Sequence, residues 1–218
     1  LCKEFVGDDK FIVYLGDNVL RKSLTDYTKK FSSSGLDAMI LLCEVDNPSK
    51  FGVAYIDKED SLKIKSIVEK PENPTSNLAV IGVYFLTPKI FDIIDDLKPS
   101  SRGELEITDA LQLLMDKGNM ITYDTVTGWW KDTGTPEDII HANRLVLDSI
   151  GTDEQFLSEK DVSIKGNIII GNNTDVSHGS SIIGPAIIGK NCKIGRNVIL
   201  GPYVSIGDNC TLENCNIE

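Results

Sequence analysis

The last quarter of the chain carries one large aliphatic residue at every sixth position. The series is unbroken over nine positions: Ile164, Ile170, Val176, Ile182, Ile188, Ile194, Leu200, Ile206 and Leu212. A helix has a period of 3.6 residues and a strand a period of two, so neither produces this pattern. A parallel β-helix does, because each hexapeptide forms one short strand of a triangular coil. Nine hexapeptides, at three to a coil, predict about three coils over residues 162–218.

A second series of mostly smaller residues stands two positions before the large ones. Its members are Val162, Ile168, Thr174, Ser180, Ala186, Cys192, Val198, Val204 and Cys210, and glycine directly follows the large residue in five of the nine repeats. We expect the second series to point inward near the bends. Cys192 and Cys210, eighteen residues apart, should stack in adjacent coils. A disulfide is disfavoured, because side chains stacked in parallel do not meet the S–S torsion.

The first 148 residues alternate between strand and helix signals, which is typical of an α/β sheet. The continuous apolar run at 11–15 predicts a strand buried on both faces. Leu20, Leu24, Tyr27 and Phe31 form the apolar stripe of a following helix.

The same alternation continues to the end of this region. Thr135 and Pro136 open its last helix, as a cap residue and a proline at the first helical position. Residues 149–161 are acidic and polar and are expected to be a linker. Further strands are expected at 38–45, 64–68, 78–86 and 120–126, with helices at 88–97 and 104–117. The strand at 64–68 should be half-buried, with Ile64, Ser66 and Val68 alternating with Lys65 and Ile67.

Two aspartates stand where ligands commonly bind in such sheets. Asp17 follows the run at 11–15, and Asp132 precedes the start of the last helix. Ligands of open α/β sheets bind beyond the carboxyl ends of the strands, and carboxylates there can hold Mg²⁺. Each segment is also an ordinary turn sequence, so the metal assignment requires the two aspartates to meet in the fold.

A second polar group follows the strand at 64–68. Glu69 can accept hydrogen bonds from sugar hydroxyls, and Lys70 offers a compact positive charge to a phosphate. Arg102, at the entry of the helix at 104–117, could reach an anion. A surface ion pair before a turn is the alternative interpretation of the Glu69–Lys70 pair.

The composition argues against several classes of protein, namely non-specific nucleic-acid binders, membrane-spanning proteins and secreted proteins. The net charge of −11 argues against non-specific nucleic-acid binding. No apolar run approaches the ~20 residues that span a membrane, and no signal-peptide pattern opens the chain. Five scattered cysteines suit a reducing cytoplasm.

Six segments, taken in order, resemble the sugar-1-phosphate nucleotidyltransferases. They are Gly-Asp-Asn at 16–18, Phe-Gly-Val at 51–53, Val-Glu-Lys-Pro at 68–71, Asn-Leu-Ala-Val-Ile-Gly-Val-Tyr at 77–84, Arg-Gly-Glu-Leu-Glu-Ile-Thr-Asp at 102–109 and Trp-Lys-Asp-Thr-Gly-Thr at 130–135. The succession is most similar to the long form of glucose-1-phosphate thymidylyltransferase, which carries a C-terminal β-helix. The resemblance implies an incomplete Rossmann-like nucleotidyltransferase domain followed by a left-handed parallel β-helix. The general rule for parallel crossovers would favour the right hand.

The resemblance also implies the chemistry. The phosphate of a sugar-1-phosphate attacks the α-phosphorus of a nucleoside triphosphate and pyrophosphate leaves, with glucose-1-phosphate and dTTP as the implied pair. Asp17 and Asp132 would hold Mg²⁺, and Lys70 would hold the attacking phosphate, making these three the implied catalytic residues. The remaining implied sugar-phosphate contacts are Gly52, Glu69, Val80, Tyr84 and Arg102. A homo-oligomer joined through the β-helix is implied as well.

One family feature does not occur in this sequence. The family opens with a Gly-rich loop, Gly-x-Gly-Thr-Arg-Leu, which cradles the triphosphate, and a Pro-Lys follows it. About ninety residues of the family's opening are missing, which is an ordinary size for half an α/β domain. The chain begins with Leu1 and ends at Glu218 in mid-repeat. We therefore expect a piece of a longer polypeptide, with a truncated β-helix and no nucleotidyltransferase activity of its own.

Three alternatives stay open. The enzyme could use another nucleotide, giving a UDP- or GDP-sugar. The chain could be a non-catalytic regulatory subunit, although the retained Asp17, Lys70 and Asp132 argue against decay of the site. A hexapeptide acyltransferase would need a base, for which His178 is the candidate as the single histidine of the repeats. A carbonic anhydrase of this fold is excluded, because it needs three histidine ligands.

Overall fold

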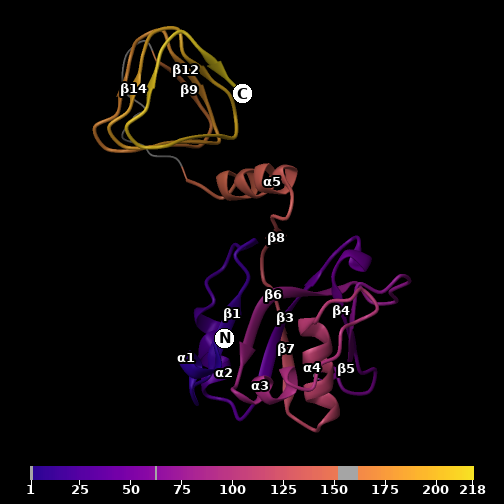
Figure 1. Ribbon diagram of the computed structural model, residues 1–218. Helices are drawn as coiled ribbons and strands as arrows, with labels where there is room; N and C mark the ends of the chain where they lie inside the picture. Colours follow the sequence, from indigo (N-terminus) through magenta and orange to yellow (C-terminus); the bar gives the residue numbers. More distant parts are fainter. Residues whose placement is uncertain (1, 62, 152–161) are drawn as a thin grey trace. The chain divides into compact units, whose positions relative to one another are not determined.

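The computed structural model describes residues 2–61, 63–151 and 162–218. The chain divides into two compact units, Leu1–Asp132 and Thr133–Glu218. Figure 1 shows the first unit as strands layered with helices, and the second as a triangular coil together with helix α5 (Pro136–Leu147). The predicted boundary at residue 148 thus lies inside the second unit, and most of the predicted linker falls outside the described residues.

The first unit is built on a six-stranded mixed sheet. Its strand order is β5-β4-β6-β3-β7, and β1 also pairs with β6. Only β3 and β7 pair in parallel, and the other pairs are antiparallel. The strands are β1 (Phe11–Tyr14), β3 (Ala38–Glu44), β4 (Gly52–Ile56), β5 (Ile64–Glu69), β6 (Leu78–Leu86) and β7 (Ile121–Thr125). The expected strands at 38–45, 64–68, 78–86 and 120–126 are therefore present, and β4 is an addition.

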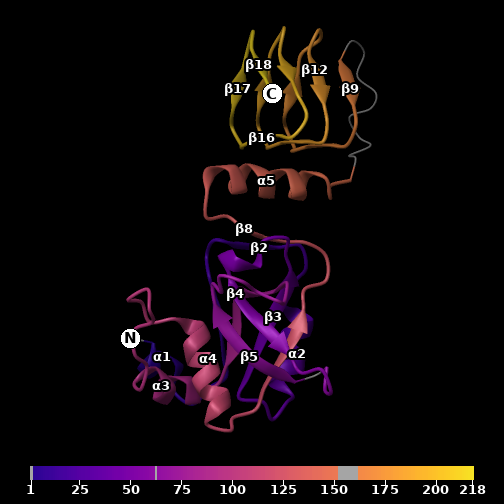
Figure 2. The same cartoon turned by 90° about the vertical axis from the view of Figure 1, so that its right-hand side faces the viewer.

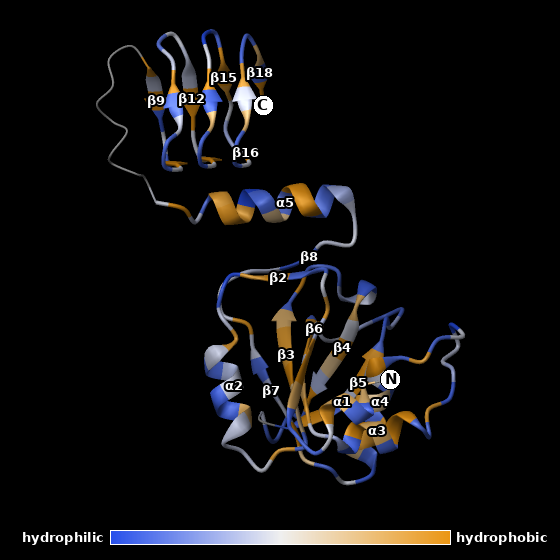
Figure 3. Cartoon of the chain, turned by 60° about the vertical axis from the view of Figure 1, so that its left-hand side comes forward, coloured by the Kyte–Doolittle hydropathy of each residue, from blue (hydrophilic) through white to orange (hydrophobic). Residues whose placement is uncertain are grey.

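Helices cover both faces of this sheet. Strand residues such as Ile40 and Leu42 pack against α3 (Lys89–Ile94) and α4 (Ile107–Asp116). Their neighbours Met39 and Leu41 pack with α2 (Thr25–Ser32) on the opposite face. Figure 2 shows α4 and α2 on opposite sides of the strands. Because both faces are buried, β3 as far as Cys43 and β6 over its whole length are almost entirely apolar, as their mainly orange colour in Figure 3 shows.

Shorter elements complete the unit. Helix α1 spans Lys3–Val6, and the 3₁₀-helix η1 spans Pro48–Lys50. Strands β2 (Asn18–Leu20) and β8 (Trp130–Asp132) form a separate antiparallel pair. Leu20 therefore belongs to a strand, and the expectation that it starts a helical stripe was wrong. Helix α2 begins only at Thr25, after the chain has left β2.

Two strands bury their side chains differently from the prediction. Strand β1 was expected to be buried on both faces, but Ile12 and Tyr14 are 39% and 44% exposed. Among the described strands β1 pairs only with β6, at the margin of the sheet. In β5, a register shift against Tyr55 and Ile56 turns Ile67 into the core and leaves Val68 outside. Such a bulge reverses an alternation that the sequence pattern alone assumes to continue.

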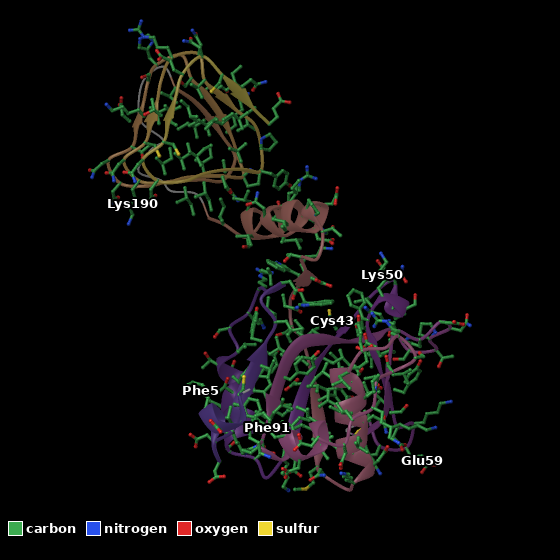
Figure 4. All side chains as sticks on the ribbon, in the orientation of Figure 1. Phe5, Cys43, Lys50, Glu59, Phe91 and Lys190 are labelled. Atoms are coloured by element: carbon green, nitrogen blue, oxygen red, sulfur yellow. The ribbon has the colours of Figure 1, made fainter. Side chains whose placement is uncertain are left out.

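The second unit confirms the hexapeptide interpretation. In the described part of this unit, ten short strands form three parallel sheets: β9-β12-β15-β18, β10-β13-β16 and β11-β14-β17. Ile164, Ile182 and Leu200 stack in register, eighteen residues apart. Figure 4 shows carbon side chains filling the triangle, while Lys190 lies at its outside. The strands are β9 (Ser163–Lys165), β10 (Ile168–Ile170), β11 (Asp175–Val176), β12 (Ser181–Ile183), β13 (Ala186–Ile188), β14 (Lys193–Ile194), β15 (Ile199–Leu200), β16 (Val204–Ile206), β17 (Thr211–Leu212) and β18 (Asn216–Ile217). The handedness stays a prediction.

The smaller series points inward and its polar members are satisfied. Thr174 Oγ1 donates to the carbonyl of Gly189 at 2.6 Å, and Ser180 Oγ donates to that of Gly195 at 2.7 Å. Cys192 is buried, and all five cysteines are free thiols, as expected. A Cβ at Gly171 would lie 2.6 Å from the backbone of Gly189, so glycine permits the close approach of successive coils. In the last coil Leu200 pairs with Ile217, one residue short of the eighteen-residue repeat.

Helix α5 (Pro136–Leu147) packs on this β-helix. Thr135 caps it by accepting a hydrogen bond from the Asp138 amide at 3.2 Å, as the sequence predicts. Asn143 accepts from the Ser205 hydroxyl at 3.0 Å, and Tyr203 donates to Asp148 at 2.9 Å. These contacts explain why the unit boundary precedes α5. No helix in the described parts of the chain is long and apolar enough to cross a membrane.

The interior stack should dominate the stability of the β-helix. Replacing Ile194, which is fully buried, by alanine is expected to lower the unfolding free energy by about 2–5 kcal/mol, because it removes contacts and leaves a cavity. Ile199→Ala is the matched control, since this isoleucine is 46% exposed and should cost less than about 1 kcal/mol. Denaturant unfolding of both variants measures the difference, and equal losses would contradict the assignment of inside and outside.

Asp37 should make the first unit sensitive to acid. Burial opposes its ionisation, but the Lys89 ammonium at 2.8 Å and the Met120 amide at 2.9 Å together lower its pKa. A lowered folded-state pKa stabilises the fold above the unfolded pKa, near 3.8, and this contribution disappears as the pH falls through the folded value. Asp37→Asn should therefore be less stable than the wild type at pH 7, with the difference shrinking below about pH 4. Unfolding curves across pH test this, and a pH-independent difference would contradict it.

Candidate functional site

A pocket opens where two strands part along one edge of β6. Strand β1 pairs with β6 as far as Tyr14 opposite Val83, and β4 joins the same edge with Val53 opposite Ala79. The C-terminal end of β1 thus faces the N-terminal end of β4 across a short gap. A pocket of about 240 Å³ lies over this gap. Such divergence of neighbouring strands is where α/β sheets commonly bind ligands.

Six segments distant in the sequence line the pocket. They are the turn after β1 (Leu15, Asp17, Asn18), the entry to β4 (Lys50, Phe51, Gly52), the end of β5 (Glu69, Lys70), β6 (Val80, Gly82, Tyr84), the start of α4 (Glu106, Ile107, Thr108) and β8 (Trp130, Asp132). Figure 4 shows Lys50 at the end of the sheet where Cys43 also lies. Seven of the eight residues singled out from the sequence share this pocket, and Arg102 is the exception.

The small ladder of β2 and β8 brings the segments that carry the two aspartates together. Asn18 is directly opposite Asp132 in that ladder, and Asp17 immediately precedes Asn18, so both aspartates line the same pocket. Mg²⁺ in proteins is commonly held by one or two carboxylates, with water and substrate phosphates completing its shell. The donor set fits such an ion. Within the described residues there is no cluster of three or more His, Cys, Asp or Glu side chains placed to hold a metal.

Glu69 is held in place on the floor of the pocket. Its carboxylate accepts a hydrogen bond from Thr108 Oγ1 at 2.9 Å, and its side chain is only 17% exposed. A Cβ at Gly52 would lie 2.5 Å from Thr108 Cγ2 and 3.1 Å from Glu69 Oε2. Glycine at 52 therefore lets the backbone approach Glu69 closely and keeps the pocket open.

Lys70 has an unusual backbone. Its φ is +39°, in the left-handed region that non-glycine residues rarely adopt. The Lys70 amide donates to the Phe51 carbonyl at 3.0 Å, which ties this conformation to the entry of β4. Strained backbone of this kind clusters at functional sites, where the side chain must take a particular direction.

Tyr84 is a buried phenol beside two acids. Burial raises its pKa, and the nearby charges of Glu69 and Asp17 raise it further. The side chain is 5% exposed and lines the pocket. At neutral pH it is therefore an uncharged hydroxyl that can donate or accept a hydrogen bond.

Arg102 lies beside the pocket and not in its lining. Its guanidinium is 3.5 Å from Glu69, 3.4 Å from Glu104 and 3.2 Å from Glu106. It thus reaches the site through Glu69. Its predicted contact with a sugar phosphate stays a prediction.

Nine residues that line the pocket were not recognised from the sequence, and four of them make contacts that shape the site. Asn18 and Thr108 are buried polar residues that bond Asp17 and Glu69, and Phe51 and Trp130 form an edge-to-face pair with centroids 5.4 Å apart. Asn18 directly follows Asp17 at the end of a strand, which was an available signal. The aromatic pair joins residues far apart in the sequence, so only the fold reveals it.

Comparison with known proteins identifies the family. Residues 1–149 match the family described as nucleotidyl transferase. The chain belongs to this family. Residues 185–217 match the bacterial transferase hexapeptide repeat, in agreement with the β-helix. The nucleotidyl-transferase match continues through α5, whereas contacts assign α5 to the second unit.

Its relatives are sugar nucleotidyltransferases. The chain is 44% identical over 217 residues to the low-salt glycan biosynthesis nucleotidyltransferase Agl11 of Haloferax volcanii, and 40% identical over 219 residues to the glucose-1-phosphate thymidylyltransferase of Streptomyces antibioticus. Each match covers all of this chain and 60% of the relative. A crystal structure of a candidate glucose-1-phosphate thymidylyltransferase from Bacillus anthracis, solved with sucrose, is similar at TM-score 0.61 and 42% identity, covering 72% of this chain and 62% of that one.

The strained backbone of Lys70 leads to a prediction about stability. Lys70→Gly and Lys70→Ala both remove the side-chain charge, so the comparison between them isolates the effect of the backbone conformation. Glycine tolerates a positive φ and alanine does not, so Lys70→Gly should be about 1 kcal/mol more stable than Lys70→Ala. Denaturant unfolding of the two variants measures the difference in unfolding free energy. An alanine variant as stable as the glycine variant would contradict the strained backbone.

Proposed function

We propose that this chain supplies the sugar-phosphate side of a nucleotidyltransferase that transfers dTMP from dTTP to glucose-1-phosphate and releases pyrophosphate. The observation that supports this most is the convergence of Glu69, Lys70, Asp17 and Asp132 in one pocket where β1 and β4 part. Family membership and the thymidylyltransferase relative support it as well.

In this proposal, side chains of the chain itself position the hexose and the attacking phosphate. Glu69, fixed by Thr108, would accept hydrogen bonds from hexose hydroxyls, and Gly52 leaves room for the ring beside it. Lys70 would hold the phosphate that attacks the α-phosphorus of the nucleotide. No protein nucleophile is required, because the sugar phosphate is itself the nucleophile. Positioning of this kind can supply a large share of the rate.

The charge balance of the pocket supports a divalent cation. Four carboxylates line it, from Asp17, Glu69, Glu106 and Asp132, against the two ammonium groups of Lys50 and Lys70. The formal sum of these six groups is −2, or −1 when Arg102, which pairs with Glu69 and Glu106 beside the pocket, is counted as well. A negative sum disfavours an anionic ligand unless a cation enters with it. Asp17 and Asp132 would hold Mg²⁺, which supplies charge neutralisation to the reacting phosphates when bound.

The remaining parts of the proposal rest on the sequence. All five cysteines are unpaired, which supports a reducing cytoplasm. The family's Gly-rich triphosphate loop does not occur in these 218 residues, so we expect binding without turnover. Residues that read the base belong to that loop region, so a UDP- or GDP-forming enzyme is the competing assignment. We also propose a homo-oligomer joined through the β-helix.

Titration of glucose-1-phosphate into the 218-residue chain, with and without Mg²⁺, tests the proposal. We expect binding that strengthens with Mg²⁺, and Asp17→Asn and Asp132→Asn should each weaken the Mg²⁺-dependent part at least tenfold, about 1.4 kcal/mol. Asp124→Asn is the control, because Asp124 pairs with Lys30 outside the pocket. No pyrophosphate should be released when dTTP is added. Mg²⁺-independent binding, or equal loss in the control, would contradict the metal assignment.

A further inference from the structure

Asn18 is a buried amide that touches three parts of the candidate site. The residue is 7% exposed and is the first residue of β2, directly after the turn that follows β1. Its Oδ1 accepts hydrogen bonds from the Gly82 amide at 3.0 Å and from Trp130 Nε1 at 2.7 Å. Its Nδ2 donates to Asp17 Oδ1 at 2.8 Å. One side chain therefore connects the central strand, the aromatic wall and the acidic edge of the pocket.

A glycine in β6, Gly82, makes room for this amide, although glycine destabilises the interior of a strand. A Cβ at Gly82 would lie 2.5 Å from Asn18 Nδ2 and 2.9 Å from Leu15 Cβ, so only glycine fits there. Glycine in a strand interior is unfavourable and often marks a close approach. Tyr14 adds a further restraint, because its hydroxyl donates to the Asn18 carbonyl at 2.8 Å. Gly82 and Tyr14 thus both help to place Asn18: the glycine leaves room for its side chain, and the tyrosine holds its backbone.

The bonding pattern requires an amide and no other group. Oδ1 uses both acceptor directions, and Nδ2 acts as a donor towards a carboxylate. A carboxylate at position 18 could keep the two accepted bonds but would meet Asp17 with like charge. An aliphatic side chain of the same size would lose all three bonds and leave buried donors unpaired.

We propose that Asn18 is a positioning residue that fixes Asp17 and Trp130 relative to β6. Through it, the carboxylate assigned to the metal and the indole wall of the sugar-phosphate pocket keep one relative placement. Asn18 acts through its neighbours and contacts no reacting atom itself. The functional consequence rests on the proposed sugar-phosphate and Mg²⁺ site, whereas the hydrogen-bonded arrangement does not.

The test uses the whole 218-residue chain in a Trp129→Phe background, so that Trp130 is the single fluorophore of its kind. Asn18→Leu should shift the Trp130 emission and weaken glucose-1-phosphate binding in the presence of Mg²⁺ at least tenfold. Asn18→Asp should retain the wild-type emission, because it still accepts from Trp130, but should not restore full binding. Gly82→Ala should reproduce the effects of Asn18→Leu by displacing the amide.

Asn119→Leu is the matched control. This substitution removes the partly buried hydrogen bond that the Asn119 side-chain amide donates to the Leu114 carbonyl, away from the pocket. Thermal unfolding establishes which variants are folded, and if Asn18→Leu does not fold, Asn18→Asp and Gly82→Ala decide. Wild-type emission and binding in a folded Asn18→Leu or Gly82→Ala would overturn the inference. If the parent chain binds no glucose-1-phosphate, the proposed function fails, and the emission of the variants alone decides the role of Asn18.

Discussion

Strand β6 is the element on which the rest of the first unit depends. Along one edge it is hydrogen-bonded to β3 over most of its length, and along the other it is shared by β1 and β4. Both of its faces are covered, by α3 and α4 on one side and α2 on the other. Because two strands share one edge, a gap must open where the first ends and the second begins. The candidate site is built over that gap.

The same constraint explains why polar residues gather there. Backbone groups and buried polar side chains near the gap need partners that a continuous ladder would otherwise supply. Asn18 provides one by accepting from the Gly82 amide, and Thr108 provides another by bonding Glu69. The result is a pocket in which carboxylates and an indole are held by buried hydrogen bonds.

Much of this architecture could be predicted from the sequence, for identifiable reasons. The β-helix has a six-residue period that neither an α-helix nor a simple strand alternation produces, and β3 and β6 are apolar runs long enough to require burial on both faces. The prediction failed where tertiary context decides burial. Strand β1 is as apolar as a central strand but lies at the sheet margin, and the bulge opposite Tyr55 reverses the alternation in β5.

The candidate site was likewise predictable only in part. Asp17, Glu69, Lys70 and Asp132 stand at strand ends or before a helix, so general rules for α/β sheets and the family resemblance both indicated them. Pairing across the small ladder of β2 and β8, the left-handed backbone of Lys70 and the bonds of Asn18 join residues that no spacing rule connects. These features could therefore be recognised only from the three-dimensional structure.

A crystal structure of the chain soaked with glucose-1-phosphate and Mg²⁺ would test the central claim most directly. The account predicts the phosphate at Lys70, the hexose beside Glu69 and Val80, and the cation between Asp17 and Asp132. Density for the ligand in the neighbouring pocket lined by Cys43, Glu44 and Asp46, or a cation bound away from both aspartates, would contradict it.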